Sequence, residues 1–140
     1  MSNIFKGKDI ERLIPQRNPM LMVDEFEATA ENVAQTVLHV RVDNLFMLPD
    51  GTLAETGLIE HIAQSAAALA GFQSGGDGQP RIGLIGEVKH FECHRRPMAG
   101  EVVHTVVEFG FSFGSVTLVQ GHCRIDDEEI ASANLKIFMQ

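Results

Sequence analysis

A chain of 140 residues with 44% hydrophobic and 21% charged residues has the composition of one globular domain rather than of a disordered protein. Its net charge of −8 argues against binding to a nucleic-acid backbone, and no apolar run approaches the ~18 residues of a membrane span. Charged residues interrupt the segment from Met1 to Arg12, unlike the apolar region of a signal peptide. We therefore expect a single cytoplasmic domain that spans residues 1–140.

The first elements along the chain are predicted to be a short helix and two strands. The helix lies near Ile10 to Ile14. The strands cover Leu21 to Ala28 and Val33 to Val42, as expected for runs of this length and composition.

The segment from Thr52 to Phe72 has the composition of a long helix, because it is rich in alanine and leucine and contains no proline. Two starts are open: Thr52 with Glu55 fits a capping box, while Thr56 fits a cap for a later start. Gly71 is the expected C-cap. The alanine-rich second half has almost no polar face, which is typical of a helix that is buried nearly all round.

The second half of the chain is predicted to consist of strands that follow a loop. The glycine-rich stretch from Ser74 to Pro80 favours a mobile loop. Four strands are expected after it, at Arg81 to His94, Glu101 to Phe113, Val116 to Ile125 and Ile130 to Met139.

One of these strands shows a regular alternation that indicates how the sheet is layered. Its apolar face carries Val103, Thr105, Val107, Phe109, Phe111 and Phe113, and the opposite face is mostly polar. This pattern predicts an antiparallel sheet that covers a core on one side, with the three phenylalanines in that core. The expected class is α+β: a long antiparallel sheet wrapped around one central helix, which is the hot-dog architecture.

Three segments resemble the FabZ-type 3-hydroxyacyl-ACP dehydratases, in the order in which that family carries them. Ile10 to Asp24 (IERLIPQRNPMLMVD) is similar to the family's opening LLPHRYPFLLVD. Gly57 to Gln64 (GLIEHIAQ) is similar to the helix motif GVLxxEAMAQ, and Arg95 to Glu101 (RRPMAGE) is similar to KRPVVPGD. The resemblance implies a hot-dog fold and thioester-bound acyl substrates, without a cofactor.

The chain departs from that family at one motif. The family carries a GHFPG segment before the helix, and its histidine is the catalytic base. The corresponding stretch, Phe46 to Thr52 (FMLPDGT), is shorter and contains no histidine. In this respect the chain looks more like the dehydratase-like proteins of aryl-polyene and flexirubin pathways. The sequence therefore identifies no base for the standard His/Glu mechanism.

Glu60 is the main candidate for chemistry, since the resemblance places it where the family has its acid. A carboxylate in the first turns of a buried helix lies in an apolar site, where it is a useful proton donor or acceptor near neutral pH. Gln64 shares its helix face and is expected to orient it. Gly57 is expected to offer a free N–H that polarises the thioester carbonyl. The structural alternatives are a glutamate favoured by the helix dipole and a glycine without a functional role.

His94, Arg95 and Arg96 form a small basic cluster in an acidic chain. The resemblance implies an acidic carrier protein that brings the acyl chain on a phosphopantetheine arm. The cluster is expected to steer this carrier toward the site. The structural alternative is a solvated turn between strands.

The remaining histidines and the cysteines receive no catalytic role. His61 follows Glu60 but points about 100° away round the helix, so adjacency alone does not bring both into one site. His90 lies on a predicted strand that a dimer could bring near the helix. Cys93 and Cys123 are expected to be reduced thiols, and no His/Cys spacing indicates a metal site.

Three functions are compatible with these residues. The first is dehydration of a 3-hydroxyacyl thioester, carried by ACP or CoA, in fatty-acid or polyene synthesis. The second is hydrolysis of an acyl thioester by a single helix carboxylate. The third is a non-catalytic binding subunit whose hot-dog partner supplies the missing histidine. A homodimer or a heterodimer with a related hot-dog subunit is expected, because a hot-dog sheet leaves an open edge.

Overall fold

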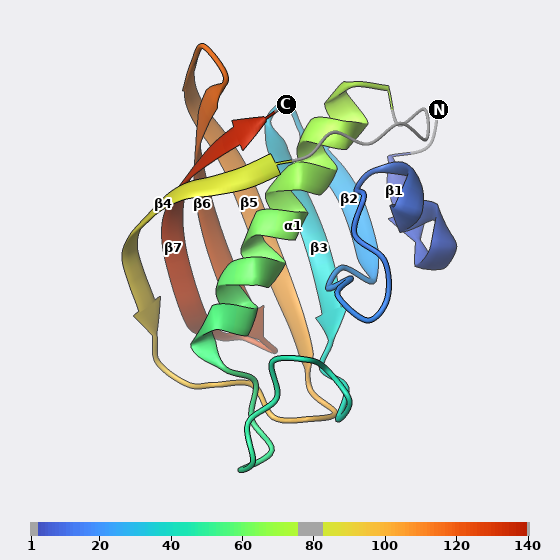
Figure 1. Ribbon diagram of the computed structural model, residues 1–140, viewed down its shortest axis with the longest axis vertical. Coiled ribbons are helices and arrows are strands. Elements are labelled where there is room, and N and C mark those ends of the chain that lie inside the picture. The colour runs from blue at the N-terminus through green and yellow to red at the C-terminus, as the bar shows by residue number, and fades with distance from the viewer. Residues whose placement is uncertain (1–2, 76–82, 140) are drawn as a thin grey trace.

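The computed structural model, which describes residues 3–75 and 83–139, shows a curved antiparallel sheet with one helix across its face (Figure 1). Within these residues the sheet contains seven strands in the order β1-β2-β3-β5-β6-β7-β4. The helices are η1, a 3-10 helix (Gly7–Arg12), and α1 (Glu55–Gln73). The strands are β1 (Ile4–Lys6), β2 (Glu25–Ala30), β3 (Val33–His39), β4 (Gly83–Cys93), β5 (Val102–Phe113), β6 (Val116–Ile125) and β7 (Glu128–Met139).

The predicted α+β hot-dog architecture is confirmed. The order of the predicted elements is the observed one, and β6 has the predicted bounds. Three features differ at the N-terminal end. The first helix, η1, covers Gly7–Arg12 rather than Ile10 to Ile14, β1 was not predicted, and the segment from Leu21 to Asp24 lies outside β2. The loop predicted between Ser74 and Pro80 falls mostly outside the described residues.

Both ends of α1 differ from the predicted caps. The residue before the helix is Ala54, whose side chain cannot cap, and the Thr52 hydroxyl instead donates to Asp50 Oδ1 at 2.6 Å. Gly71 lies inside the helix rather than at its C-cap, which is Ser74. A Cβ atom on Gly71 would clash with the backbone carbonyl of Leu13. This glycine is therefore required by the close approach of another segment.

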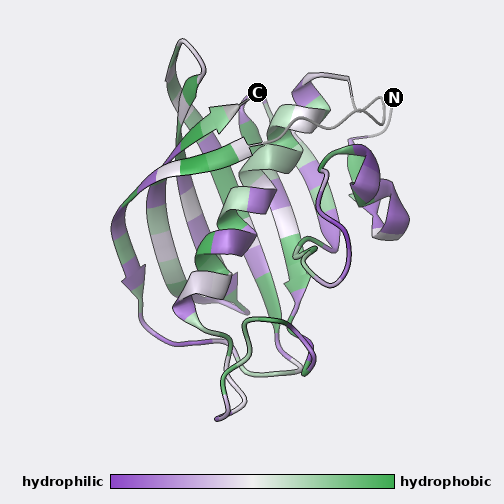
Figure 2. Cartoon of the chain, viewed as in Figure 1, coloured by the Kyte–Doolittle hydropathy of each residue, from purple (hydrophilic) through white to green (hydrophobic). Residues whose placement is uncertain are grey.

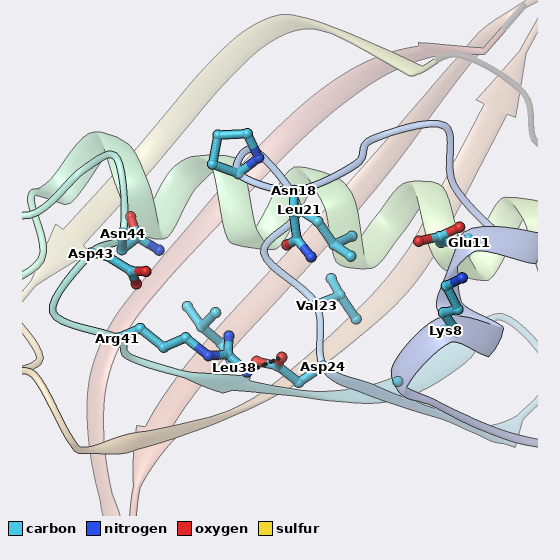
Figure 3. A pocket seen from close by; sticks show the side chains of 12 residues that line it. Lys8, Glu11, Asn18, Leu21, Val23, Asp24, Leu38, Arg41, Asp43 and Asn44 are labelled. Atoms are coloured by element: carbon cyan, nitrogen blue, oxygen red, sulfur yellow. Dashed lines mark hydrogen bonds and ion pairs between the residues drawn. The ribbon is translucent and has the colours of Figure 1, made fainter.

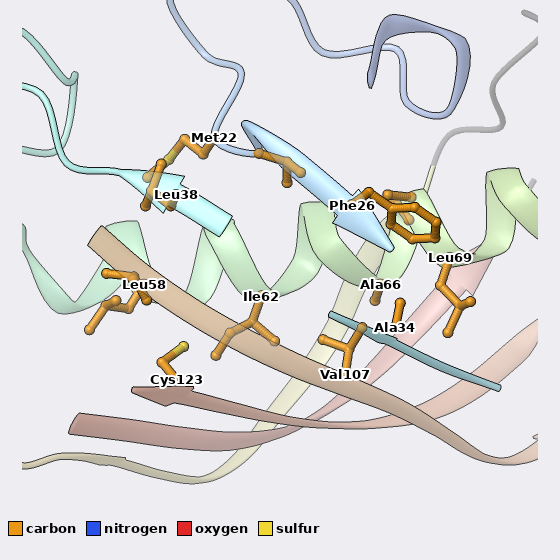
Figure 4. Packing of buried hydrophobic residues seen from close by; sticks show 14 of the residues in the cluster. Met22, Phe26, Ala34, Leu38, Leu58, Ile62, Ala66, Leu69, Val107 and Cys123 are labelled. Carbon is orange, nitrogen blue, oxygen red and sulfur yellow. The ribbon is translucent and has the colours of Figure 1, made fainter. Parts of the chain in front are cut away.

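The core lies between α1 and the sheet. The buried helix residues Leu58, Ile62, Ala66 and Leu69 face buried residues of the strands (Figure 4). Gly121 on β6 makes room for Ile62, because a Cβ atom there would lie 2.5 Å from the Ile62 Cγ2 atom. Along the strands, apolar and polar residues alternate (Figure 2). Burial of one such leucine or isoleucine contributes about 1.5–3 kcal/mol to stability.

The prediction of a phenylalanine stripe in the core is wrong for two of its three members. Phe111 and Phe113 are 80% and 59% exposed, while Phe109 packs against the core. The cause is a β-bulge: Phe109 pairs with Val119 and Ser112 with Thr117, so two residues of β5 oppose Leu118 alone. One extra residue moves all following side chains to the other face of the sheet.

Candidate active site

The first turns of α1 hold Glu60 and Gln64 together. Glu60 is half-buried and Gln64 is buried. The Gln64 side-chain oxygen accepts the Met22 N–H at 2.6 Å, and its nitrogen donates to Met20 O and to Glu60 Oε2, both at 2.9 Å. Because Met22 N–H needs an acceptor, the Gln64 amide has one orientation, with its N–H groups toward Glu60. The structure thus brings these two predicted site residues together.

His61 faces the core rather than the candidate site. It is fully buried, with Nδ1 2.7 Å from Met22 O and Nε2 2.8 Å from Thr105 Oγ1. A carbonyl oxygen can only accept, so Nδ1 carries the proton and Nε2 accepts from the Thr105 hydroxyl. Burial lowers the pKa of His61 to about 4, against smaller opposing effects of the Met22 carbonyl and Asp24. Because this imidazole is buried and both of its nitrogens are hydrogen-bonded, it cannot serve as the base for a substrate bound at Glu60.

The expectation of a free N–H at Gly57 is wrong. The Gly57 N–H donates to Ala54 O at 2.9 Å, inside the first turn of the helix. A Cβ atom at this position would lie 2.7 Å from Phe46 Cβ and 3.0 Å from Leu53 Cδ1. The glycine lets the loop before α1 pack against the helix, and it supplies no oxyanion donor in this arrangement.

The basic cluster is brought together, but its guanidinium groups are already paired. Arg95 lies 2.8 Å from Glu101 and 3.4 Å from Glu128. The Arg95 hydrogen bond holds the pKa of the Glu101 carboxyl below its usual value. These exposed or half-buried pairs neutralise Arg95 where a docking site for an acidic carrier needs free positive charge. His94 is the exposed member, and its Nε2 lies 3.9 Å from Glu92.

Arg96, in the same cluster, connects two segments of the chain. Its guanidinium contacts Asp50 at 3.1 Å, Glu55 at 3.5 Å and the Thr52 hydroxyl at 3.0 Å. Asp50 and Thr52 belong to the segment that stands where FabZ-type proteins carry their histidine, and Glu55 is the first residue of α1. Arg96 therefore fixes the loop before α1 to the β4–β5 connection, which is a structural function that the sequence did not reveal.

A cavity of about 550 Å³ lies between η1, the end of β3 and the segment before β2 (Figure 3). Leu21 and Val23 line it, whereas the intervening Met22 is bonded to the helix. None of the predicted site residues lines this cavity. Its charged residues include Asp24 and Arg41, which pair at 3.0 Å. Asp24 also accepts the His39 N–H at 2.7 Å, so it fastens β3 to the segment before β2 and has a structural explanation.

The arrangement provides one oriented carboxylate. In residues 3–75 and 83–139 no histidine is hydrogen-bonded to Glu60, and no group of three metal-ligating side chains lies close enough to hold an ion. No helix in these ranges is long and apolar enough to cross a membrane. The site can donate or accept one proton.

Sequence reasoning missed the contacts of His61 with Met22 and Thr105. The helical period places His61 on the same buried face as Leu58 and Ser65. A polar ring on that face requires partners, because buried polar groups are nearly always hydrogen-bonded. This signal predicts that His61 is bonded, although it does not identify the partners.

The seven-stranded sheet curved around one carboxylate-bearing helix defines a hot-dog protein. The model of the ApeP-like family, described as ApeP dehydratase, matches residues 8–140. The chain therefore belongs to the ApeP-like family of dehydratases, which confirms the predicted FabZ-like relationship and makes the protein a lyase.

Similar proteins agree with this membership. The 3-hydroxyacyl-[acyl-carrier-protein] dehydratase FabZ of Natranaerobius thermophilus is 27% identical over 131 residues, covering 91% of this chain and 92% of the relative. The dehydratase heterocomplex ApeI:P of Xenorhabdus doucetiae contains a chain with a TM-score of 0.84 at 16% identity, covering 94% and 90%. A hypothetical thioesterase of Streptococcus pneumoniae shares the fold, with a TM-score of 0.65 at 10% identity and coverages of 82% and 84%.

Proposed function

We propose that this dehydratase converts 3-hydroxyacyl thioesters to trans-2-enoyl thioesters in fatty-acid or polyene synthesis, with Glu60 as the proton donor. The observation that carries the proposal is the Glu60 carboxylate, which Gln64 holds in one orientation on the helix that resembles the FabZ-type motif. The FabZ relative is named for 3-hydroxyacyl-ACP, which supports the same class of substrate.

The proposed reaction is an elimination of water. A base removes the proton on the carbon next to the thioester carbonyl, and that electron pair forms the carbon–carbon double bond. The carbon–oxygen bond to the 3-hydroxyl breaks as the carboxylic acid of Glu60 gives its proton to the leaving oxygen, which departs as water. The base later releases its proton to solvent, and Glu60 takes one up. Gln64 occupies one carboxyl oxygen and leaves the other for the substrate.

A second hot-dog subunit is proposed to supply the base. Glu60 has no histidine partner within the described residues, and the segment Phe46 to Thr52 contains none. The structural relative named as a dehydratase heterocomplex supports a partner that differs from this chain. A homodimer is the alternative arrangement, in which a base such as His90 would come from an identical subunit.

Hydrolysis of the thioester is the second candidate function. A half-buried glutamate can also activate a water molecule, and a hot-dog relative is named as a thioesterase. Hydrolysis releases a free thiol, whereas dehydration does not, so the two reactions have different products.

The test is a product assay with the purified chain alone and after mixing with a hot-dog paralogue that carries the GHFPG histidine. Each sample receives a 3-hydroxyacyl thioester or its saturated analogue. Enoyl product from the hydroxy substrate alone, without free thiol, supports dehydration. Free thiol from both substrates supports hydrolysis and contradicts the proposal. Enoyl product that forms only in the mixture supports a base from the partner.

The carrier is proposed to be ACP, in keeping with the name of the FabZ relative, and CoA is the alternative. Because its guanidinium groups are paired within the chain, the cluster of His94, Arg95 and Arg96 contributes less steering than isolated cations would. Running the assay with both thioester carriers compares their kcat/KM values directly.

We also propose that the protein is located in the cytoplasm.

A further inference from the structure

Side chains of α1 form hydrogen bonds to the backbone of the segment from Met20 to Met22. In a strand, the backbone of a neighbouring strand would form such bonds. Gln64 accepts the Met22 N–H at 2.6 Å and donates to Met20 O at 2.9 Å. His61 bonds Met22 O at 2.7 Å. Two helix side chains thus satisfy three backbone groups of this segment, which lies just before β2. We refer to these three hydrogen bonds as the Met22 latch.

His61 connects the latch to the centre of the sheet. Its Nδ1–H reaches Met22 O, and its Nε2 accepts from Thr105 Oγ1 at 2.8 Å. Thr105 is buried in β5, and its hydroxyl also lies 3.3 Å from Cys123 Sγ. An imidazole with both nitrogens bonded has one ring orientation, so the Met22 carbonyl is fixed relative to the core strands.

The latch also reaches the candidate catalytic carboxylate. His61 holds the carbonyl of Met22 and Gln64 holds the amide of the same residue, while the Gln64 nitrogen donates to Glu60 Oε2 at 2.9 Å. A shift of Met22 would therefore change the orientation of the Gln64 amide and release Glu60. His61 itself points about 100° away from Glu60 and does not touch the reacting atoms.

We propose that His61 is a positioning residue for Glu60, acting through Met22 and Gln64. This inference rests on the proposed function, in which Glu60 transfers the proton. A displacement of about 1 Å at a reacting group can reduce a rate by up to about a hundredfold, so a latch of this kind affects the chemical step rather than substrate binding.

Two substitutions distinguish the roles of the two imidazole nitrogens of His61. His61→Asn places an amide N–H near the position of Nδ1, and His61→Gln places its amide near the position of Nε2. If the Met22 bond positions Glu60, the Asn variant keeps a kcat close to the wild-type value. The Gln variant then loses about tenfold or more in kcat, with KM unchanged.

Ser65→Ala is the matched control, since Ser65 is another buried polar residue of α1. Its hydroxyl bonds Thr36 at 2.7 Å and the His61 backbone carbonyl at 2.8 Å, and it takes part in none of the three latch hydrogen bonds. The Ser65→Ala variant is expected to lose stability without loss of kcat. A purely structural role of His61 predicts instead that kcat of all three variants follows their stability. Equal loss of kcat in the Asn and Gln variants overturns the proposal.

Nuclear magnetic resonance gives a readout that needs no enzyme activity. The wild-type protein is expected to show the Nδ1–H tautomer of His61 and a slowly exchanging Met22 amide. Met22 exchange should be at least about tenfold faster in His61→Gln than in His61→Asn if the latch has opened. If a variant does not fold, an Nε2–H tautomer or a rapidly exchanging Met22 amide in the wild type overturns the proposal.

These readouts separate failure of the inference from failure of the proposed function. An opened latch with unchanged kcat contradicts the positioning role of His61 while leaving Glu60 as the proton donor. Full activity of Glu60→Gln contradicts the proposed function itself and removes the basis for a positioning role, whatever the amide exchange shows.

Discussion

Individual polar residues of α1 are placed so that each buried one has partners. His61, Gln64 and Ser65 are all buried, and each is bonded to a group outside the helix. An unbonded polar group in this core would cost about 1–3 kcal/mol, so the three residues constrain how the helix sits. Glu60 differs, because it is half-buried and bonded only through Gln64 among the described contacts. It is the one polar residue of this set that remains accessible to a ligand.

Neutral His61 makes the stability of the protein depend on pH. Its pKa is about 4 in the folded protein and near 6.5 in the unfolded chain, so the unfolded state binds the proton first as pH falls. The free energy of unfolding should therefore drop by about 3 kcal/mol between pH 6.5 and pH 4 from this group. Asp24 acts weakly in the opposite direction, and Cys123 stays uncharged because burial raises its pKa to about 12.

Urea unfolding at a series of pH values measures this dependence. His61→Asn has no titrating ring and should show a shallower loss of stability over the same range. Equal slopes in the wild type and the Asn variant would show that other groups cause the acid sensitivity.

The two cysteines are predicted to remain unpaired. Cys93 on β4 and Cys123 on β6 both lie opposite Ala131, on the two sides of β7. Two strand spacings separate their Cα atoms by roughly 9–10 Å, whereas a disulfide needs less than about 7 Å. Thiol titration after denaturation should give two thiols without a reductant. One thiol or none would contradict this register.

At the scale of elements, the β-bulge in β5 decides which aromatic side chains are buried and which are exposed. Phe26 is buried against Phe5 and Phe72, with ring centroids at 5.9 and 5.6 Å, while Phe111 is mostly exposed beyond the bulge. Phe26→Ala is expected to cost about 3–5 kcal/mol of unfolding free energy, and Phe111→Ser less than about 0.5 kcal/mol. Chemical denaturation of both variants compares them. A cost near 2 kcal/mol or more for Phe111→Ser would indicate that another chain covers this side chain.

The sequence predicted the elements better than their junctions. Alternation along β5 and the alanine-rich composition of α1 are local signals, and they identified the strand and the buried helix. The bulge at Gly110 and Phe111 depends on pairing with β6, and Gly71 is explained by the carbonyl of Leu13, which is distant in sequence. Neither contact is visible in a local pattern.

The same division holds for the candidate site. Glu60 and Gln64 are one helical turn apart, so their contact follows from helix geometry, and the structure has it. The Met22 latch and the pairing of Arg96 with Asp50 join residues that are 39 to 46 positions apart. The prediction of a free N–H at Gly57 was wrong for a related reason, because it depended on the residue at which the helix begins.

At the scale of the whole molecule, β4 is the long strand at one edge of the sheet, and β1 at the other edge has only three residues. The edge strand β4 carries the exposed apolar residues Leu84, Ile85 and Val88. A long, apolar, unpaired edge is a pairing surface for another chain. We therefore predict that this protein forms a dimer, with itself or with a related hot-dog subunit, through β4.

Light scattering at micromolar concentration tests the assembly. A dimer is expected for the wild type or for its mixture with the partner, and Ile85→Lys should shift it toward monomer. Val42→Lys is the matched control, because Val42 is also exposed but lies outside the strands. Monomers under both conditions, or equal effects of the two lysines, would contradict pairing through β4.

The role of Glu60 is tested most directly by the dehydration rate of Glu60→Gln, measured with whichever partner gives the wild type its activity. Glutamine preserves the shape and most hydrogen bonds of the side chain but cannot exchange the proton. The variant is predicted to keep its unfolding midpoint and to lose about a hundredfold or more in rate. Glu108→Gln, on the exposed outer face of β5, should retain the wild-type rate. A Glu60→Gln protein that dehydrates the substrate at the wild-type rate would contradict the assignment.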